Sequence, residues 1–304
     1  MGALEKCELC PRACGVNRES RGRGRCHETA VVRVARVSLH MWEEPCISGT
    51  KGSGTVFFTG CPLGCVYCQN HNIADGGNGT PVTQEQLTQI FLKQQENGAN
   101  NINLVTPTHF VPQIAAALEE AKWRGLTLPI VYNTGSYETV ETLRRMDGLV
   151  DIYLPDLKYW SPKRAARYSN APDYFAVASA AIAEMVRQVG PPVFDEENMM
   201  RRGVIVRHMM LPGGLIDSKR IVRYLWETYG DEIFMSLMSQ YTPVAGAADY
   251  PEIDRKVPWP DYFDLVDYAA DLGVTQAFVQ EEEAASESFI PDFEHFDLKK
   301  YLEG

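Results

Sequence analysis

The sequence has no run approaching the roughly 20 consecutive apolar residues that a membrane-spanning helix needs. Residues 1–12 are charged and show no apolar stretch before a small-residue cleavage site, so we expect no secretory signal. Basic residues are not in excess either, because 29 Lys and Arg stand against 40 Asp and Glu and give a formal net charge of −11. Since nucleic-acid binding needs concentrated Lys and Arg, a nucleic-acid partner is not expected. We therefore expect a soluble, cytoplasmic protein that binds neither membranes nor nucleic acids.

The composition is otherwise that of an ordinary globular protein. The 304 residues are 45% hydrophobic and 23% charged, which excludes a disordered chain, a collagen-like repeat and a coiled coil. Charge is unevenly spread, since residues 1–36 hold eight basic and four acidic residues and residues 241–304 hold 15 acidic and four basic ones. The basic segment could dock an anionic partner, but a solvated face that complements the acidic end is the simpler interpretation.

Cysteine is the most informative residue type. The chain has eight cysteines, and without a secretion signal they favour metal or cluster ligation over a disulfide framework. Cys61, Cys65 and Cys68 place three thiolates in eight residues directly after an apolar strand-like run, and Gly60 lets the backbone turn tightly. Three thiolates fit a [4Fe–4S] cluster whose fourth iron stays open to an outside ligand. A structural zinc site is the alternative, and it would need a fourth ligand such as His71.

A second group of cysteines lies near the start of the sequence. It supplies four thiolates, enough to close a metal site: Cys7, Cys10, Cys14 and Cys26. Three of them within eight residues favour a second Fe–S cluster or a rubredoxin-like centre, and structural zinc remains the alternative. A cluster could relay electrons or bind substrate, whereas zinc would stabilise a segment too small for its own core. Cys46 stands alone and is interpreted as a buried or incidental thiol, with a role at the site as the alternative.

Apolar strand-like runs alternate with helical segments through most of the chain. The runs are TVFFT (55–59), INLVT (102–106), PIVY (129–132), VDIYL (150–154), GVIVRHMM (203–210) and IFMSLM (233–238). A first helix is expected to start at a capping box at 83–86. Further helices are expected at 111–124, 137–146, 165–189 with a break near Pro172, and 218–229. This alternation predicts an α/β fold with a parallel sheet curled into a partial (β/α)6 TIM-like barrel.

Three regions are expected along the chain. Residues 1–50 form a Cys-rich metal-binding extension, residues 51–243 form the barrel core, and residues 244–304 form an acidic C-terminal cap with a helix at 262–272 and a strand at 274–279. Within this cap, the segments 281–283 and 291–293 are expected to cover an opening of the barrel or to serve as a docking surface.

Polar residues follow the predicted strands. In barrels of this kind the active site is built at the carboxyl ends of the strands, so these residues should face the cysteine loop. The candidates are Thr106, Thr108, Asn133, Asp156, Lys158, Arg207 and Gln240. Thr106, Thr108 and Asn133 could instead be turn residues, and Asp156 with Lys158 could be a surface ion pair. A buried Arg207 needs a partner, and His109 and His208 are expected to make local hydrogen bonds.

The cysteine loop carries a family resemblance. The run Cys61-Pro-Leu-Gly-Cys65-Val-Tyr67-Cys68 resembles the signature of radical S-adenosylmethionine (radical SAM) enzymes, with Tyr67 in the aromatic position. Together with Cys7-x2-Cys10-Pro-Arg and the run EEPCISG at 43–49, it resembles the PflX-like branch of the pyruvate formate-lyase activating enzyme relatives. The resemblance implies a [4Fe–4S] cluster, S-adenosylmethionine (SAM) bound at the open iron, and a flavodoxin- or ferredoxin-type electron donor. It further implies reductive cleavage of SAM to methionine and a 5′-deoxyadenosyl radical that abstracts hydrogen.

The resemblance also implies roles for the strand-end residues. Lys158 would be the cation for the methionine carboxylate and Asp156 would lie at a polar corner beside it, while Arg207 corresponds to the fifth-strand Arg of the activating enzymes. Lys158 and Arg207 are thus the candidate catalytic residues, and Tyr67 would pack beside the adenine.

Two strand ends depart from the family pattern. The usual Gly-Gly-Glu that holds the amine is replaced by Thr106-Pro-Thr108, which leaves carbonyls and hydroxyls to accept its hydrogen bonds. The third strand offers Tyr-Asn133-Thr-Gly where the activating enzymes have Asp-Thr-Asn-Gly, so a bound alkali cation is not expected. Gln240 is a further candidate for the cofactor or substrate.

Three functions remain open. The first is an activase that abstracts hydrogen from a glycine of a glycyl radical protein. Against it, residues 48–54 (SGTKGSG) lack the Asp-Gly-Pro-Gly-x-Arg run of those enzymes. The second is a stand-alone catalyst that acts on a small molecule or peptide, and the third is a non-catalytic iron–sulfur electron carrier.

Overall fold

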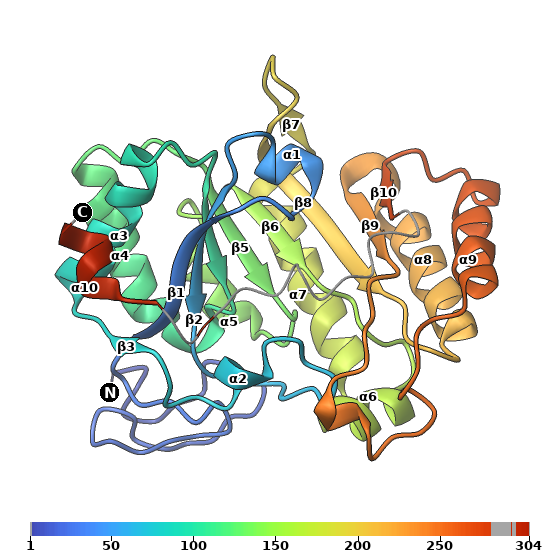
Figure 1. Ribbon diagram of the computed structural model, residues 1–304, viewed down its shortest axis with the longest axis horizontal. Coiled ribbons are helices and arrows are strands. Elements are labelled where there is room, and N and C mark those ends of the chain that lie inside the picture. The colour runs from blue at the N-terminus through green and yellow to red at the C-terminus, as the bar shows by residue number, and fades with distance from the viewer. Residues whose placement is uncertain (1, 281–292, 294–295, 304) are drawn as a thin grey trace.

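The computed structural model describes residues 2–280, 293 and 296–303 of the chain. Its centre is one curved sheet in the order β10-β9-β8-β6-β5-β4-β2-β1-β3 (Figure 1). The strands are β1 (Arg33–His40), β2 (Ser53–Phe58), β3 (Thr80–Pro81), β4 (Ile102–Val105), β5 (Ile130–Thr134), β6 (Ile152–Pro155), β7 (Val193–Phe194), β8 (Met200–Met209), β9 (Phe234–Met238) and β10 (Ala277–Val279). Every pairing from β2 to β10 along this order is parallel, so the predicted partial barrel is confirmed.

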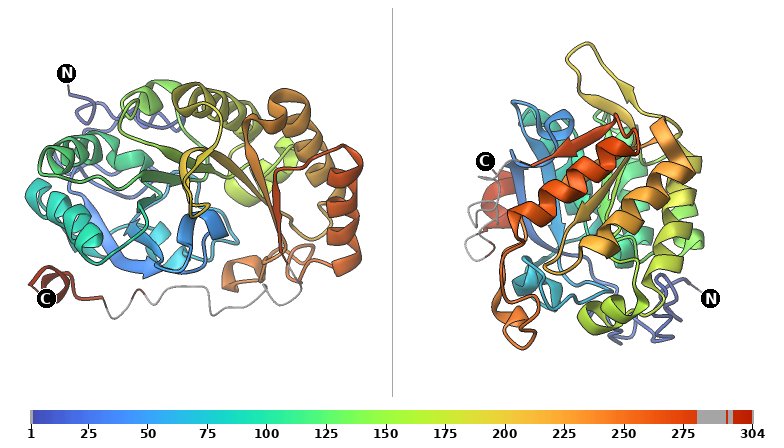
Figure 2. Two further views of the ribbon diagram at one scale, coloured as in Figure 1. Left: turned by 90° about the horizontal axis from the view of Figure 1, so that it is seen from above. Right: turned by 90° about the vertical axis from the view of Figure 1, so that its right-hand side faces the viewer.

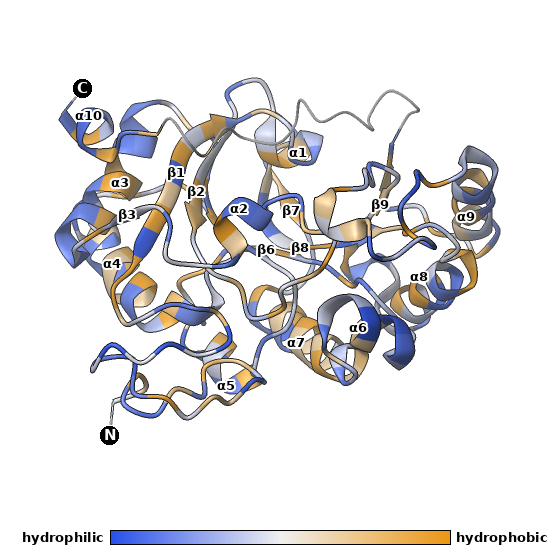
Figure 3. Cartoon of the chain, turned by 60° about the horizontal axis from the view of Figure 1, so that its bottom comes forward, coloured by the Kyte–Doolittle hydropathy of each residue, from blue (hydrophilic) through white to orange (hydrophobic). Residues whose placement is uncertain are grey.

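Helices cover the outer face of the sheet, as the view from above in Figure 2 shows. They are α3 (Gln84–Glu96), α4 (Val111–Trp123), α5 (Val140–Arg144), α7 (Tyr174–Val189), α8 (Leu215–Tyr229) and α9 (Trp259–Asp271). The other helices are α1 (Pro45–Ser48), α2 (His71–Ala74), α6 (Pro162–Ser169) and α10 (Leu298–Glu303), with 3-10 turns at Thr108–Phe110, Gly230–Glu232 and Ala245–Ala247. In Figure 3 the hydrophilic residues of these helices lie largely on their outward faces, as expected when one stripe of each helix packs on a sheet. Within the described residues, no helix is both long and apolar enough to cross a membrane.

Local sequence signals account for most helix boundaries. The capping box at the start of α3 is present, because Thr83 accepts a hydrogen bond from the Gln86 backbone and Gln86 reaches back to Thr83. The expected helix at 137–146 is shorter than predicted and spans only Val140–Arg144. Ser136 has a left-handed φ of 62°, which keeps the preceding loop out of the helix, and Thr139 caps the first turn. The predicted break in 165–189 separates α6 from α7, with Asn170 as the left-handed cap.

Strand β1 was not anticipated from the sequence. It pairs antiparallel with β2 and also with β3, and thus extends the parallel sheet at one edge. Because β1 runs opposite to β2, residues 41–52 leave it at the amino-terminal end of the barrel. There α1 closes the barrel, as Cys46 and Ile47 pack against Val131 and Ile152 from the lumen side of the strands. Cys46 is therefore a buried thiol at the end of the barrel opposite Cys61.

The amino-terminal segment lies at the carboxyl ends of the strands (Figure 1). Arg12 joins it to the cysteine loop by donating to the carbonyl oxygens of Pro62 and Ser169, both at 2.9 Å. Arg18 is fully buried and donates to three backbone carbonyls, including that of His109. These contacts fix an otherwise irregular segment against the barrel.

The acidic end is described only in part. The glutamates at 281–283 and residues 291–292 lie outside the described residues. Phe293 packs edge-on against Phe57 of β2, with ring centroids 5.3 Å apart, and Tyr301 of α10 lies beside Asn97 after α3. The predicted strand at 274–279 is realised as β10, which pairs in parallel with β9.

Candidate functional site

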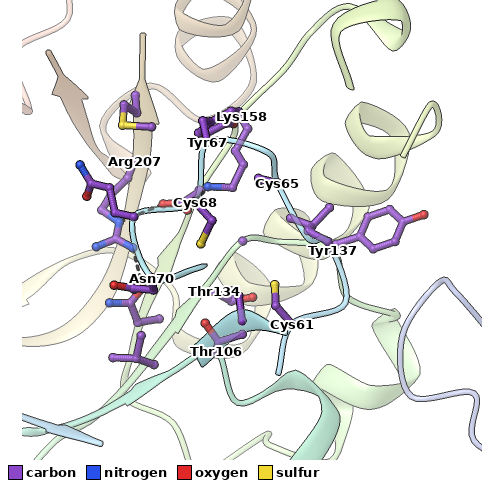
Figure 4. A pocket seen from close by; sticks show the side chains of 18 of the residues that line it. Cys61, Cys65, Tyr67, Cys68, Asn70, Thr106, Thr134, Tyr137, Lys158 and Arg207 are labelled. Atoms are coloured by element: carbon purple, nitrogen blue, oxygen red, sulfur yellow. Dashed lines mark hydrogen bonds and ion pairs between the residues drawn. The ribbon is translucent and has the colours of Figure 1, made fainter. Parts of the chain in front are cut away.

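A cavity of about 260 Å³ opens at the carboxyl ends of the strands and continues into the barrel lumen. All eleven residues predicted at the barrel site contribute to its wall: Cys61, Cys65, Tyr67, Cys68, Thr106, Thr108, Asn133, Asp156, Lys158, Arg207 and Gln240. Figure 4 shows the three cysteines around the same space as Lys158 and Arg207. The expectation that active-site residues lie at the carboxyl ends of the strands thus identified these residues correctly. Their roles toward a ligand stay predictions.

The cysteine loop is held in place by backbone geometry and by neighbouring hydrogen bonds. Gly60 has φ 81°, and a Cβ at this position would lie 2.5 Å from the Cys26 carbonyl oxygen. Ser169 donates a hydrogen bond to the Cys65 Sγ at 2.9 Å, and the Cys68 N–H donates to the Cys65 carbonyl. The loop therefore requires glycine at position 60 for both conformation and space.

The three thiols influence one another and Lys158. Burial and the neighbouring Cys65 raise the pKa of the Cys61 thiol, and burial together with both other cysteines raises the pKa of Cys68 to about 12. Lys158 acts in the opposite direction on both thiols, so its positive charge lies within electrostatic range of the loop. A cation placed here stabilises thiolate and any anionic ligand bound beside it.

The arrangement of the donors distinguishes a cluster from a single zinc ion. Among the described residues, no three His, Cys, Asp or Glu side chains are grouped so as to hold one metal ion. Thiolates of a cubane cluster each bind a different iron and need not meet at one point, whereas structural zinc needs four donors about 2.0–2.3 Å from one ion. His71, the suggested fourth zinc ligand, is exposed and contributes nothing to the cavity wall. The loop therefore fits a three-thiolate cluster.

Opposite the cysteines, Arg207 lies at the centre of a buried polar network. Its Nε donates to Asp156 at 3.1 Å, its Nη1 donates to Glu43 at 3.1 Å, and its Nη2 donates to Asn133. Asp156 also accepts from the Lys158 Nζ at 2.6 Å. The four charged side chains of this network are at most 18% exposed. Asp156 and Lys158 therefore form a largely buried pair rather than the surface ion pair considered above.

Burial and neighbouring charges act in opposite directions on this network, and burial raises the pKa of Glu43. Burial alone would raise the pKa of Asp156, but Lys158 and Arg207 outweigh it and hold that pKa below its usual value. Burial likewise opposes the charge of Lys158, yet Asp156 raises its pKa overall. Arg207 has three of its N–H groups occupied by protein partners, whereas Lys158 uses one. Among the described residues, every nitrogen of Arg207 is thus already engaged by the protein, whereas the Lys158 Nζ has two of its three N–H groups left for a ligand.

Two predicted cofactor residues lie at the edges of the cavity. Tyr67 is buried among other tyrosines, accepts a hydrogen bond from the Tyr159 hydroxyl at 2.7 Å, and meets the Tyr241 ring edge-on. The Gln240 side chain accepts from Gln280 at 3.1 Å. The Tyr67 hydroxyl is thus already satisfied, which leaves its ring as the part that faces a ligand.

The loop after β4 adopts an uncommon backbone conformation. Thr106 has a φ of 58°, a left-handed value that is rare for a β-branched residue. Its N–H donates to the Asn133 carbonyl at 2.9 Å, so β5 helps to hold it. Thr106 therefore takes a conformation usually left to glycine, at the position where the family resemblance expects glycine.

Sequence reasoning missed two carboxylates. Glu43 comes from the loop after β1 and reaches Asn103, Asn133 and Arg207. Glu138 follows β5 and accepts hydrogen bonds from Thr108 and Thr134. The sequence signal for Glu43 was the pair of glutamates at the start of the run EEPCISG, which did not indicate its contact with Arg207. For Glu138 no motif was available.

The two histidines near the site make the expected local hydrogen bonds. The His109 Nε2 lies 2.7 Å from the Thr59 carbonyl, and burial lowers its pKa to about 3. The His208 ring lies 2.7 Å from the Leu157 carbonyl and 2.8 Å from the Ser218 hydroxyl. Neither contributes to the cavity wall, so both support the strand ends as structural residues.

Comparison with known proteins supplies the family. The sequence profile of the radical SAM superfamily matches residues 55–225. The chain belongs to this superfamily. This radical SAM protein is 28% identical over 271 residues to the uncharacterized protein MJ0674 of Methanocaldococcus jannaschii. The alignment covers 85% of this chain and 72% of that protein.

The fold of this radical SAM protein is compared with two solved structures. The FeFe-hydrogenase maturase HydG from Carboxydothermus hydrogenoformans superposes with a TM-score of 0.51 at 12% identity, over 80% of this chain and 54% of that one. A radical SAM methyltransferase from Sphaerobacter thermophilus gives a TM-score of 0.49 at 15% identity, over 75% of this chain and 66% of that one. The chain thus spans about half to two thirds of these proteins. At such low identity the HydG likeness shows the fold alone.

Membership defines the basic chemistry. The protein is a radical SAM enzyme that uses a [4Fe–4S] cluster and SAM, needs a reductant, and generates a 5′-deoxyadenosyl radical. When bound, the reduced cluster supplies the one electron that splits SAM into methionine and this radical. Cys61, Cys65 and Cys68 are the residues present that would hold the cluster, and Lys158 supplies a cation beside it. The hypothesis of a non-catalytic iron–sulfur electron carrier, which predicts no SAM cleavage, is thereby set aside.

Proposed function

We propose that this radical SAM enzyme abstracts hydrogen from a small polar molecule or a short peptide held in the barrel lumen. The observation that supports this is the wall of the cavity beyond the cysteines, where Glu43, Asn133 and Arg207 are held together in one polar network. Such preorganised hydrogen-bonding groups in a cavity orient small polar ligands. A substrate held inside the barrel lumen is also shielded from water, which protects a reactive radical.

In this proposal the residues of the chain bind and orient SAM. Lys158, held by Asp156, pairs with the methionine carboxylate. The Tyr67 ring packs beside the adenine, and Thr106, Thr108 and Gln240 complete the wall. Arg207 and Asn133 then face the substrate from the lumen side, where their mutual hydrogen bond fixes both side chains.

An activase function is the second candidate. The sequence resemblance to the PflX-like branch of the activating enzymes supports it, and the substrate would then be a glycine of a glycyl radical protein. The absence of the Asp-Gly-Pro-Gly-x-Arg run before the cysteine loop counts against it. A flavodoxin- or ferredoxin-type donor would supply the electron in either case.

We also propose that the amino-terminal cysteines hold a second metal centre, an Fe–S cluster or a zinc ion. Their number and spacing support it. Burial, together with the charges of Cys26, Glu138 and Cys14, raises the pKa of Cys10 to about 12. Since no three donors in the described part of the chain meet at one point, a cluster, whose thiolates bind different irons, fits these cysteines better than one zinc ion. The segment contacts the cysteine loop directly through Arg12 and through Arg25, which donates to the Leu63 carbonyl at 3.3 Å.

Deuterium transfer tests the substrate class. The reconstituted, reduced enzyme is incubated anaerobically with SAM and either the low-mass or the macromolecular fraction of a perdeuterated cell extract. We expect deuterium in 5′-deoxyadenosine with the low-mass fraction. Deuterium with the macromolecular fraction alone, accompanied by a glycyl radical signal in electron paramagnetic resonance, would show the activase instead. A Cys61→Ala variant is the background control because it lacks one cluster ligand.

A further inference from the structure

A buried carboxylate stands directly behind the cavity wall. Glu138 is 2% exposed and does not itself line the cavity. Its Oε1 accepts hydrogen bonds from the hydroxyls of Thr108 and Thr134, both at 2.6 Å. These two threonines come from the loop after β4 and the end of β5, and both contribute to the cavity wall. Glu138 therefore joins two strand ends through side chains that face the ligand space.

Nothing in the described part of the chain neutralises this carboxylate. None of its ion pairs there involves Glu138. The second oxygen, Oε2, is buried without a hydrogen-bond partner, as is the nearby Tyr132 hydroxyl, which lowers the pKa of this carboxyl. Burying a carboxylate without a cation is unfavourable. A positively polarised ligand group on the other side of the two hydroxyls would relieve that cost.

The direction of the two hydrogen bonds matters for the ligand. Each threonine hydroxyl has one O–H and two lone pairs, and here each O–H is given to Glu138. The Thr134 hydroxyl already accepts from the Ser136 N–H at 3.2 Å, so it has one lone pair left for a donor in the cavity. The lone pairs of the Thr108 hydroxyl are likewise left for such a donor. Figure 4 shows Thr134 and Thr106 on the side of the cavity that also holds Cys61, one of the three residues that would hold the cluster at which SAM binds.

We propose that Glu138 is a positioning residue for SAM. It orients the Thr108 and Thr134 hydroxyls so that they accept hydrogen bonds from the SAM amino group, and it supplies the negative charge that the chain lacks after β4. The Thr-Pro-Thr sequence there has no carboxylate of its own, and the structure brings one from the next loop instead. The inference rests on SAM binding, which family membership establishes, and not on the substrate proposed above.

Binding of SAM and of its analogues tests this role. Affinities of the reconstituted enzyme are measured anaerobically for SAM, for the analogue that lacks the amino group and for decarboxylated SAM. In Glu138→Gln the amide cannot supply the charge, and we expect SAM and decarboxylated SAM to bind about 10- to 100-fold more weakly. Binding of the deaminated analogue should be unchanged. Lys158→Met should show the opposite selectivity and weaken SAM and the deaminated analogue more than decarboxylated SAM.

Matched threonine variants separate positioning from folding. Thr108→Val removes one hydroxyl at constant shape and should weaken SAM binding, with no additive effect in the double variant with Glu138→Gln. Thr142→Val in α5 removes a buried hydroxyl outside the cavity and should leave affinity unchanged. If Glu138→Gln weakens all three ligands equally, or none of them, the proposal is overturned. The ratio of the affinities for SAM and for the deaminated analogue does not depend on the substrate. The role of Glu138 and the proposed substrate class are therefore tested independently.

Discussion

Arg207 shows how a single buried residue depends on distant parts of the sequence. The sequence indicates that an Arg in an apolar strand needs partners, and the structure supplies them from positions 43, 133 and 156. Asp156 and Asn133 were predictable because neighbouring parallel strands end at the same edge. Glu43 was not, because its position depends on how residues 41–52 turn under the barrel.

Glu138 gives a residue-scale prediction about pH. Burial raises its pKa to about 7, and the hydroxyls of Thr108, Thr134 and Tyr132 only partly offset this. Because the pKa is raised, the carboxyl should be protonated below about pH 7 and ionised above it. Infrared difference spectra between wild type and Glu138→Gln should therefore show a protonated-carboxyl band that is lost as the pH rises through about 7. A band that titrates near the ordinary pKa of glutamate, about 4.3, would contradict the buried environment.

At the scale of elements, the cysteine loop depends on Gly60. A Cβ at this position would meet the Cys26 carbonyl oxygen at 2.5 Å, and the φ of 81° is unfavourable for other residues. Gly60→Ala should therefore displace the loop and lower the iron bound per chain after reconstitution.

Gly98 provides the matched control. It has nearly the same φ, 80°, but a Cβ there would meet nothing within 4 Å. Gly98→Ala should cost only backbone strain, about 1 kcal/mol, and keep its iron. Equal iron content in both variants would show that contact with the Cys26 segment does not shape the loop.

Much of this element pattern could be read from the sequence. Near-continuous apolar runs predicted β2, β4, β5, β6, β8 and β9, because strands buried on both faces carry that pattern. Strand β1 was missed because the segment was assigned to loops around a metal site. The segment 137–146 was predicted too long because its sequence does not reveal the left-handed Ser136.

At the scale of the whole molecule, the amino-terminal cysteines lie on the cluster side of the barrel. Arg12 and Arg25 link their segment to the backbone between Cys61 and Cys65. A metal centre there would therefore stabilise the cysteine loop from outside. Its identity could not be predicted from spacing, because both zinc and Fe–S sites use four thiolates.

Metal analysis tests the second centre. Replacing Cys7, Cys10, Cys14 and Cys26 together with Ser should lower the metal content by one Fe–S cluster or one zinc ion per chain, with the cluster at Cys61 retained in part. The complementary variant with Ser at positions 61, 65 and 68 should keep the amino-terminal metal. An unchanged metal content in the first variant would refute the second centre.

The account as a whole depends on three thiolates that hold a cluster with one iron open to SAM. The most direct measurement is the formation of 5′-deoxyadenosine by the anaerobically reconstituted, reduced protein. The account predicts 5′-deoxyadenosine and methionine in equal amounts from wild type, and none from the variant with Ala at positions 61, 65 and 68. Intact SAM under these conditions, or zinc as the metal bound by these three cysteines, would contradict it.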